Sequence, residues 1–206
     1  LPRLRAETFA VGAVVLSFGG WFISTFKPRA INTDAPGAYG GIGAFNLVRR
    51  SAFDKTEGWP WLRLEIADDV GLGLLLHRHG SKARMGLAYD DLAITWYPTL
   101  PDMIRGLEKN TFAAAGRFSV LRAVLGSCLL LATTIAPVAL LATAFMPVGL
   151  LTIAAVMVGP TLGPKKFGFP VLAHVLAPLA GVVIAYIVLR SAWMTKRRGC
   201  LVWRGT

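Results

Sequence analysis

The sequence predicts a mixed α/β domain joined to helices that enter a membrane, a fold class of α/β plus membrane helices. Hydrophobic residues make up 54% of the 206 residues and the mean hydropathy is +0.56, which is too apolar for a soluble domain of this size. The charge is unevenly placed, because residues 27 to 117 carry most of it and residues 118 to 194 carry almost none. We therefore expect a polar part followed by a membrane part.

The membrane part contains three apolar runs, which we expect to be three transmembrane helices: Ser119 to Phe145, Pro147 to Gly163 and Phe169 to Trp193. The first run is long enough to cross a hydrocarbon core of about 30 Å. The positive-inside rule places Arg117, Lys165 and Lys166 in the cytoplasm, but the "KRRG" after the third run then falls on the opposite side. Either the middle run is re-entrant or the third run does not fully cross.

A further apolar run, Phe9 to Phe26, precedes the polar part. It either spans the membrane or lies in the interface with Trp21 and Phe22 as anchors. Gly19 and Gly20 weaken a straight spanning helix and favour the interfacial alternative. The run lacks a cleavage box, so no signal peptide is expected, and the two chain ends suggest a fragment of a longer protein.

The polar part begins with "GAFNLVRR", residues 43 to 50, whose alternation predicts a strand. Ser51 with Asp54 resembles a capping box and predicts a short helix ending near Gly58. Asp68 and Asp69 are expected to open a second helix.

The rest of the polar part carries clear helix signals. Gly80 is expected to close the helix that the two aspartates open. Strand and loop follow over residues 81 to 98. Thr99 then caps an amphipathic helix from Leu100 to about Ala115, which we expect to lie on the membrane surface.

The net charge of +11 does not predict a nucleic-acid partner, because the basic residues are scattered or flank apolar runs. A membrane surface with anionic headgroups explains them better. Cys128 and Cys200 fit neither a disulfide framework nor a zinc spacing and are expected to be free thiols.

The adjacent Asp68 and Asp69 are the first candidates for chemistry. Successive helical positions point about 100° apart, so one carboxylate can cap the helix while the other projects into a cleft. The positive end of a helix favours an ionised carboxylate, which suits a general base. Acidic residues in a first helical turn are also common as simple caps, and both interpretations remain open on local grounds.

Other polar groups are weaker candidates. The glycines of "YGGIGAFNLVRR", among them Gly41 and Gly43, let a backbone approach a ligand, and Arg49 can meet phosphate. They precede the expected strand, which excludes a dinucleotide fingerprint, and a flexible loop with solvated arginines is an equal alternative. His77 and His79 are two residues apart and do not have the helical metal-ligand spacing.

Aromatic and basic residues surround the start of the amphipathic helix. Trp96 and Tyr97 can stack on a sugar or a lipid headgroup, and Arg105 or Lys109 can pair with a diphosphate. The alternative is that Lys109 simply belongs to the wet face of the helix.

Taken in order, four blocks resemble the second half of a family 2 membrane glycosyltransferase. They are "GAFNLVRRSAF", "EIADDVGLGLLLHRHGSKAR", "WYPTLPDMIRGLEKNTFA" and the apolar runs with a closing "WRGT". The chain is most similar to the ceramide-glucosyltransferase-like and hopanoid- or carotenoid-associated bacterial branch. The resemblance covers nearly the whole chain and depends on the order and spacing of the blocks.

The resemblance implies a GT-A type nucleotide-diphospho-sugar transferase domain and assigns "ADDVGL" to the family's acidic motif. Asp69 is then the base that deprotonates the acceptor hydroxyl in a single inverting displacement, and Asp68 is its supporting neighbour. The remaining candidates would contact substrate: Gly41, Gly43, Asn46, Arg49, Trp96, Tyr97, Arg105 and Lys109.

Two departures from the family pattern limit this assignment. The Gln/Arg-x-x-Arg-Trp motif falls near "RGLEK", where Arg105 matches but Glu108 and Lys109 replace Arg and Trp. The family's Asp-x-Asp motif, which holds the nucleotide diphosphate and a Mg or Mn ion, does not occur in the sequence. We therefore expect a fragment that lacks the donor-binding half and is inactive alone.

The implied protein moves a sugar from a nucleotide sugar to a lipid acceptor at the inner or plasma membrane, with its catalytic part cytoplasmic. The alternative is a non-enzymatic polytopic protein, such as a transporter subunit or a scaffold. A transporter is expected to show broken or charged helices at mid-membrane depth, where these runs offer only His174, Pro137 and Pro178. The expected organisation is an apolar helix over 1–30, the catalytic part over 31–98, the interfacial helix over 99–117, the transmembrane region over 118–194 and a basic tail over 195–206.

Overall fold

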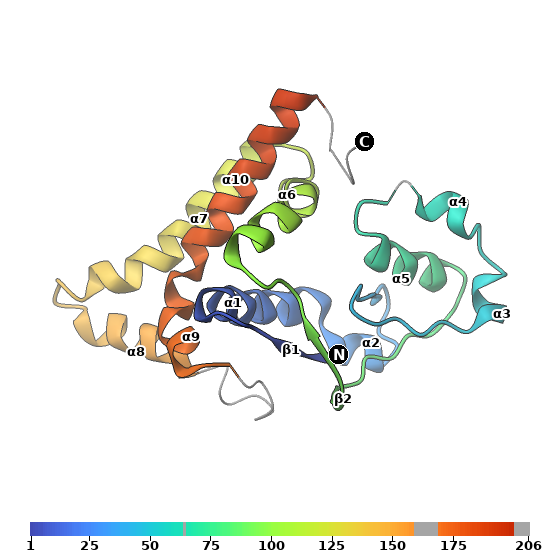
Figure 1. Ribbon diagram of the computed structural model, residues 1–206, viewed down its shortest axis with the longest axis horizontal. Helices are drawn as coiled ribbons and strands as arrows, with labels where there is room; N and C mark the ends of the chain where they lie inside the picture. The colour runs from blue at the N-terminus through green and yellow to red at the C-terminus, as the bar shows by residue number, and fades with distance from the viewer. Residues whose placement is uncertain (64, 159–168, 200–206) are drawn as a thin grey trace. The chain divides into compact units, whose positions relative to one another are not determined.

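The computed structural model describes residues 1–63, 65–158 and 169–199. These residues form two compact units (Figure 1). The first unit contains Leu1–Arg3 and Gly20–Ile94, and the second contains Leu4–Gly19 and Thr95–Thr206.

The first unit is built from short helices and a small sheet. Strands β1 (Pro2–Arg5) and β2 (Ala88–Thr95) pair with each other. Leu1 donates its N–H to the Gly86 carbonyl and accepts a hydrogen bond from Ala88 N at 2.9 Å, which is the offset of a parallel pair. The helices of this unit are α2 (Pro28–Asn32), α3 (Arg50–Phe53), α4 (Trp59–Leu62) and α5 (Asp68–Arg78). The predicted mixed α/β composition is confirmed, with a sheet of two strands in the described part of the chain.

Two local predictions in this unit are wrong. Residues 43–49 are not a strand, because Phe45 N bonds to the Ile42 carbonyl at 3.1 Å in a turn that interrupts the alternating run. The Ser51–Asp54 capping box is also absent, since the N-cap of α3 is Arg49, two residues before Ser51, and its side chain makes no capping hydrogen bond. Short apolar runs specify a strand only when a partner strand is in reach, and the described residues supply none here.

The two strong helix signals are confirmed. Gly80 has a φ of +75° immediately after α5, and Ser81 N bonds to the Leu76 carbonyl at 3.0 Å, which is a Schellman termination that favours glycine. Thr99 caps α6 (Leu100–Gly116) by accepting from Asp102 N at 3.3 Å.

The second unit is a helical bundle around two long apolar helices. The first is α7 (Val120–Leu140), and the second is the segment Val171–Arg198, which comprises α9 (Val171–Leu176), a 3-10 turn η2 (Ala177–Leu179) and α10 (Ala180–Arg198). Both are long and apolar enough to cross a membrane. Their exposed faces are apolar, as at Leu125 and Leu129 of α7. The expected membrane part is therefore present as two candidate spans.

The middle apolar run forms a shorter helix, α8 (Met146–Val158). Its 13 residues extend only about 20 Å at 1.5 Å per residue, which is less than a hydrocarbon core of about 30 Å. The rest of the expected span, residues 159–163, lies outside the described part of the chain, as do Lys165 and Lys166. The three expected spans are thus reduced to two among the described residues.

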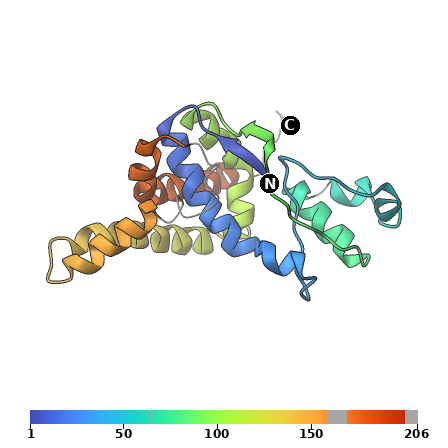
Figure 2. The ribbon, with the colours of Figure 1, turned by 90° about the horizontal axis from the view of Figure 1, so that it is seen from below.

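α7 and α10 lie side by side and run in opposite directions (Figure 1). Ala123, near the start of α7, packs with Ala192, near the end of α10. At the opposite ends of the two helices, Gly181 lies directly against Thr134. The turn between α7 and α8 lies at that far end in both views (Figures 1 and 2). Arg117 and the Lys196–Arg198 run consequently lie at the same end of the pair, as the positive-inside rule favours. Lys165 and Lys166, the other cations that the rule places in the cytoplasm, lie outside the described residues.

The apolar helix α1 (Phe9–Phe26) packs its first half into this bundle. Val11 and Val14 are buried with Met103 of α6 and Ala173 of α9. Ser17 donates a hydrogen bond to the Ala177 carbonyl at 3.0 Å. The interfacial and spanning predictions for this run did not include this protein contact, and the side chains of the proposed anchors Trp21 and Phe22 lie outside the description.

Candidate functional site

The acidic pair occupies the first turn of α5. Asp68 Oδ1 accepts from Asp69 N at 3.1 Å, and Asp69 Oδ1 accepts from Val70 N at 2.9 Å. The N-cap residue, Ala67, has no side chain that can cap the helix. The two carboxylates therefore satisfy backbone N–H groups that a helix start leaves unpaired.

Asp69 also holds a second segment of the chain. Its Oδ2 atom accepts a hydrogen bond from Gly43 N at 2.7 Å. The two residues are 26 positions apart, so this contact joins the helix to the glycine-rich loop, defined here as residues Gly40 to Asn46. Asp68 is exposed and makes no such contact among the described residues. The structure thus distinguishes the two carboxylates: one only caps, and the other also binds a loop.

The glycine-rich loop lies against α5 backbone to backbone. A Cβ at Gly41 would overlap the carbonyl oxygen of Asp69, and a Cβ at Gly73 would overlap the carbonyl oxygen of Gly40. The loop closes on itself where Asn46 Oδ1 accepts from Ile42 N at 3.1 Å. Only glycine permits so close an approach. Four of the predicted site residues, Asp69, Gly41, Gly43 and Asn46, are brought together here.

Gly73 was not predicted from the sequence, whereas Gly40 belongs to the glycines that were expected to allow a close backbone approach. The available signal was the pair of glycines in "DDVGLGLLL", because glycine inside a helix costs stability and usually marks a close contact. The partner of Gly73, more than 30 residues away, could not be read from that signal.

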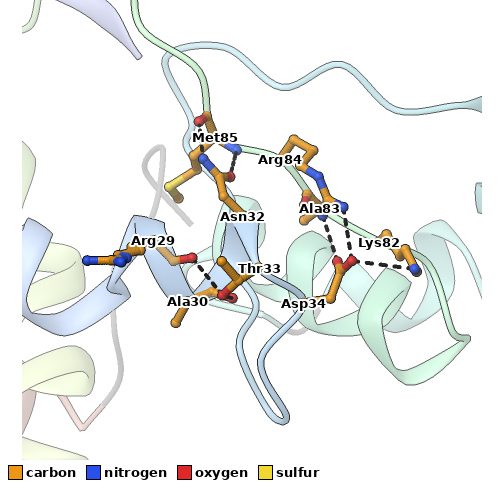
Figure 3. Close-up of polar contacts among 9 residues, drawn as sticks. All are labelled: Arg29, Ala30, Asn32, Thr33, Asp34, Lys82, Ala83, Arg84 and Met85. Carbon is orange, nitrogen blue, oxygen red and sulfur yellow. Dashed lines mark hydrogen bonds and ion pairs between the residues drawn. The ribbon is translucent and has the colours of Figure 1, made fainter.

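A polar cluster beside α5 fixes the segments that flank the loop (Figure 3). The Arg84 guanidinium donates to both oxygens of Asp34 at 2.6 and 2.9 Å, and Lys82 Nζ lies 3.4 Å from Asp34 Oδ2. The hydrogen bond from Arg84, with Lys82 nearby, lowers the pKa of Asp34 to about 2. Asn32 adds two bonds to the Met85 backbone, its Nδ2 donating to the carbonyl at 2.9 Å and its Oδ1 accepting from Met85 N at 2.7 Å. The chain before the loop is thereby held to the chain after α5.

Arg49 lies on the exposed surface of the same unit. It is the N-cap residue of α3, three positions beyond the end of the glycine-rich loop. The structure leaves its side chain accessible, which suits either a solvated arginine or a contact with phosphate.

The four remaining predicted residues belong to the second unit. Trp96 packs on Phe18 with ring centroids 4.9 Å apart and on Tyr97 at 5.4 Å. Tyr97 lies against Gly106 of α6, and its burial raises the pKa of its hydroxyl. Both rings pack against the apolar core of that unit, and this packing accounts for their position without a ligand.

Arg105 and Lys109 lie on α6. The Arg105 guanidinium donates to Asp102 Oδ1 at 2.6 Å. Hydrogen bonds from Thr99 and then from Arg105 lower the pKa of Asp102. The side chain of Lys109 lies outside the description.

No group of three His, Cys, Asp or Glu side chains lies close enough to hold a metal ion within the described residues. His79 Nδ1 contacts the Leu75 carbonyl at 2.9 Å, and the His77 ring lies against Tyr39. The residues present therefore do not fit the divalent cation that the family resemblance implies, and no chemical step is assigned to a metal here.

Neither the protein-family models, nor the curated proteins, nor the solved structures contain a match to this chain.

Proposed function

We propose that this chain is the acceptor-side part of a membrane glycosyltransferase of family 2 type, in which Asp69 is the general base. One observation carries the proposal: the Asp69 carboxylate stands at the start of α5 and binds Gly43 of the glycine-rich loop. The resemblance of the sequence blocks supplies the reaction class, and the geometry around Asp69 is compatible with that role.

Asp69 retains the capacity to take a proton. An ionised carboxylate has about four lone-pair sites, and the two oxygens of Asp69 use one each on Val70 N and Gly43 N. The side chain is partly exposed, so a hydroxyl can approach the remaining lone pairs.

The proposed reaction is a single inverting displacement. Asp69 accepts the proton of the acceptor hydroxyl while the hydroxyl oxygen bonds to the anomeric carbon of the sugar. The bond from that carbon to the diphosphate oxygen breaks, and the nucleoside diphosphate leaves with the electron pair. The backbone of the glycine-rich loop holds the Asp69 carboxylate in position, because Gly41 and Gly73 allow the loop to lie directly on α5.

A lipid acceptor is proposed from the second unit. It contains two apolar helices long enough to cross a membrane and the amphipathic helix α6. Donor and cation binding are not assigned to this chain, since its sequence contains no Asp-x-Asp. We propose that the donor-binding half lies elsewhere in the full-length protein and that the reaction takes place at the cytoplasmic face of the membrane.

The test is a transfer assay on membranes that contain the full-length protein. The membranes are incubated with a panel of radiolabelled nucleotide sugars and Mg²⁺ or Mn²⁺, and the extracted lipids are counted for label. Membranes from cells without the protein are the control. Label in a lipid that depends on the protein supports the proposal. If no donor gives labelled lipid or releases nucleoside diphosphate above the control, a non-enzymatic membrane protein is the better account.

A further inference from the structure

We infer that one end of the α7–α10 pair is a binding surface for the headgroup of an anionic phospholipid. The surface, called here the basic end, consists of Arg117, Arg122, Lys196 and Arg197. It depends on the membrane insertion of α7 and α10 and does not depend on the proposed sugar transfer.

The fold brings together two basic segments that are about 75 residues apart in the sequence. Ala123 and Ala192 pack with each other in one buried cluster. Arg122 is therefore placed beside the last turns of α10, which carry Lys196 and Arg197. Arg117 follows α6 directly, and a Cβ at Gly116 would contact Ala123 at 3.3 Å. Three helix ends thus meet at the basic end.

Among the described residues, the positive charge of the basic end is largely not neutralised by acidic side chains. Glu108 is the acidic residue nearest to it in sequence on α6, and its carboxylate pairs with Arg190 at 2.9 Å and with Arg198 at 3.7 Å. We therefore leave Arg198 out of the surface. All four side chains of the basic end are exposed. α7 has no acidic residue in its first turn, and Arg122 lies there instead.

An anionic lipid headgroup is the partner that this position and chemistry favour. The surface lies at one end of two helices that are long and apolar enough to cross a bilayer. In a bilayer that these helices cross, this end lies at the depth of the lipid phosphates. Arg197 stacks over Trp193 at 5.2 Å, and Trp193 is exposed; tryptophan and arginine together are typical of the membrane interface. Basic clusters between or beside membrane helices commonly bind anionic headgroups.

The experiment measures thermal unfolding of the full chain in detergent with added phosphatidylglycerol or phosphatidylcholine. A ligand that binds only the folded protein raises the unfolding midpoint. We expect phosphatidylglycerol to raise the midpoint more than phosphatidylcholine. The triple variant Arg122→Gln, Lys196→Gln, Arg197→Gln should lose at least half of that difference.

A charge-matched control separates this surface from the general attraction of a chain with a net charge of +11. The variant Arg50→Gln, Lys55→Gln, Arg63→Gln removes three exposed cations from the first unit and should keep the full phosphatidylglycerol effect. Equal losses in the two variants would overturn the inference. It would also be overturned if inorganic phosphate raised the midpoint as much as the lipid does.

Discussion

A buried serine joins the amphipathic helix α6 to α10, part of a candidate membrane span, and the effect of its removal on stability can be worked out. Ser191 is fully buried; its hydroxyl accepts from Phe112 N at 3.0 Å and donates to the Glu108 carbonyl. These two groups are the donor and acceptor of one helical turn in α6. Ser191→Ala leaves both without the hydroxyl that bridges them.

The loss of stability in Ser191→Ala can be worked out from these two hydrogen bonds. Interhelical hydrogen bonds in membrane helices contribute about 0.6 kcal/mol each on average, and a buried group left unpaired costs about 1–3 kcal/mol. Helix α6 can recover part of the loss by joining Phe112 N to the Glu108 carbonyl directly. We therefore expect Ser191→Ala to lower the free energy of unfolding by roughly 1–3 kcal/mol.

Ser127→Ala is the matched control. Ser127 of α7 is also buried, at 2% exposure, but its hydroxyl has no hydrogen-bond partner among the described residues. Both substitutions gain the same helix propensity, so the difference between them isolates the bonds. Unfolding is followed by far-UV circular dichroism during titration of detergent micelles with dodecyl sulfate. If Ser191→Ala is no more destabilising than Ser127→Ala, the fastening role of Ser191 is wrong.

Three further predictions concern the loop, the polar cluster and the membrane topology. Gly73→Ala should destabilise the first unit because its Cβ would overlap the backbone of the glycine-rich loop. Gly71→Ala should destabilise it less, because its Cβ would meet Glu65 Cγ at 2.9 Å and Cβ at 3.1 Å, a side chain that can partly move away. Thermal unfolding of the two variants compares them, and equal midpoints would contradict the contact of Gly73 with the loop. The pKa of Asp34 in the folded protein is lowered to about 2, below the ordinary aspartate value of about 4. The ionised carboxylate therefore stabilises the fold fully above about pH 4, and this stabilisation is lost as the pH falls toward 2. The difference in unfolding midpoint between wild type and Asp34→Asn should shrink over that pH window, and a difference that stays constant would refute the charge effect. The membrane topology is tested in sealed, oriented vesicles, with a protein in which the native cysteines are replaced by serine. Phe118→Cys and Lys196→Cys should react with an impermeant maleimide from the same side of the membrane, and a cysteine in the α7–α8 turn should react from the other side. If Phe118→Cys and Lys196→Cys react from opposite sides, the antiparallel pair is not the membrane topology.

Local signals in the sequence predicted the helices whose first or last residues form a recognisable cap. Thr99 and Gly80 were sufficient for one helix start and one helix end, because a cap is decided by a few neighbouring residues. The two longest apolar runs were sufficient for the two candidate spans. The strand expected over residues 43–50 failed because a strand depends on a partner elsewhere in the chain.

The long-range contacts could not be predicted from the sequence. The antiparallel packing of α7 on α10 decides which basic segments share an end, and no local pattern encodes it. The contact between Gly73 and Gly40 and the bond from Gly43 to Asp69 likewise join segments that are 26 or more positions apart. The place of Asp69 at a helix start was predicted from a local pattern and is confirmed. Its role as a base came only from the resemblance of the ordered blocks and stays a prediction.

The most direct test of the central claim compares Asp69→Asn with Asp68→Asn in the full-length protein. Asparagine keeps the size of the side chain and one acceptor oxygen for Gly43 N, but it cannot take the acceptor proton. The rate of sugar transfer to lipid should fall by about 10²–10⁴-fold in Asp69→Asn, the usual contribution of a general base, while membrane insertion and far-UV circular dichroism stay unchanged. Asp68→Asn should lose far less. Near-normal transfer by Asp69→Asn would contradict the account and leave Asp69 as a clamp for the glycine-rich loop.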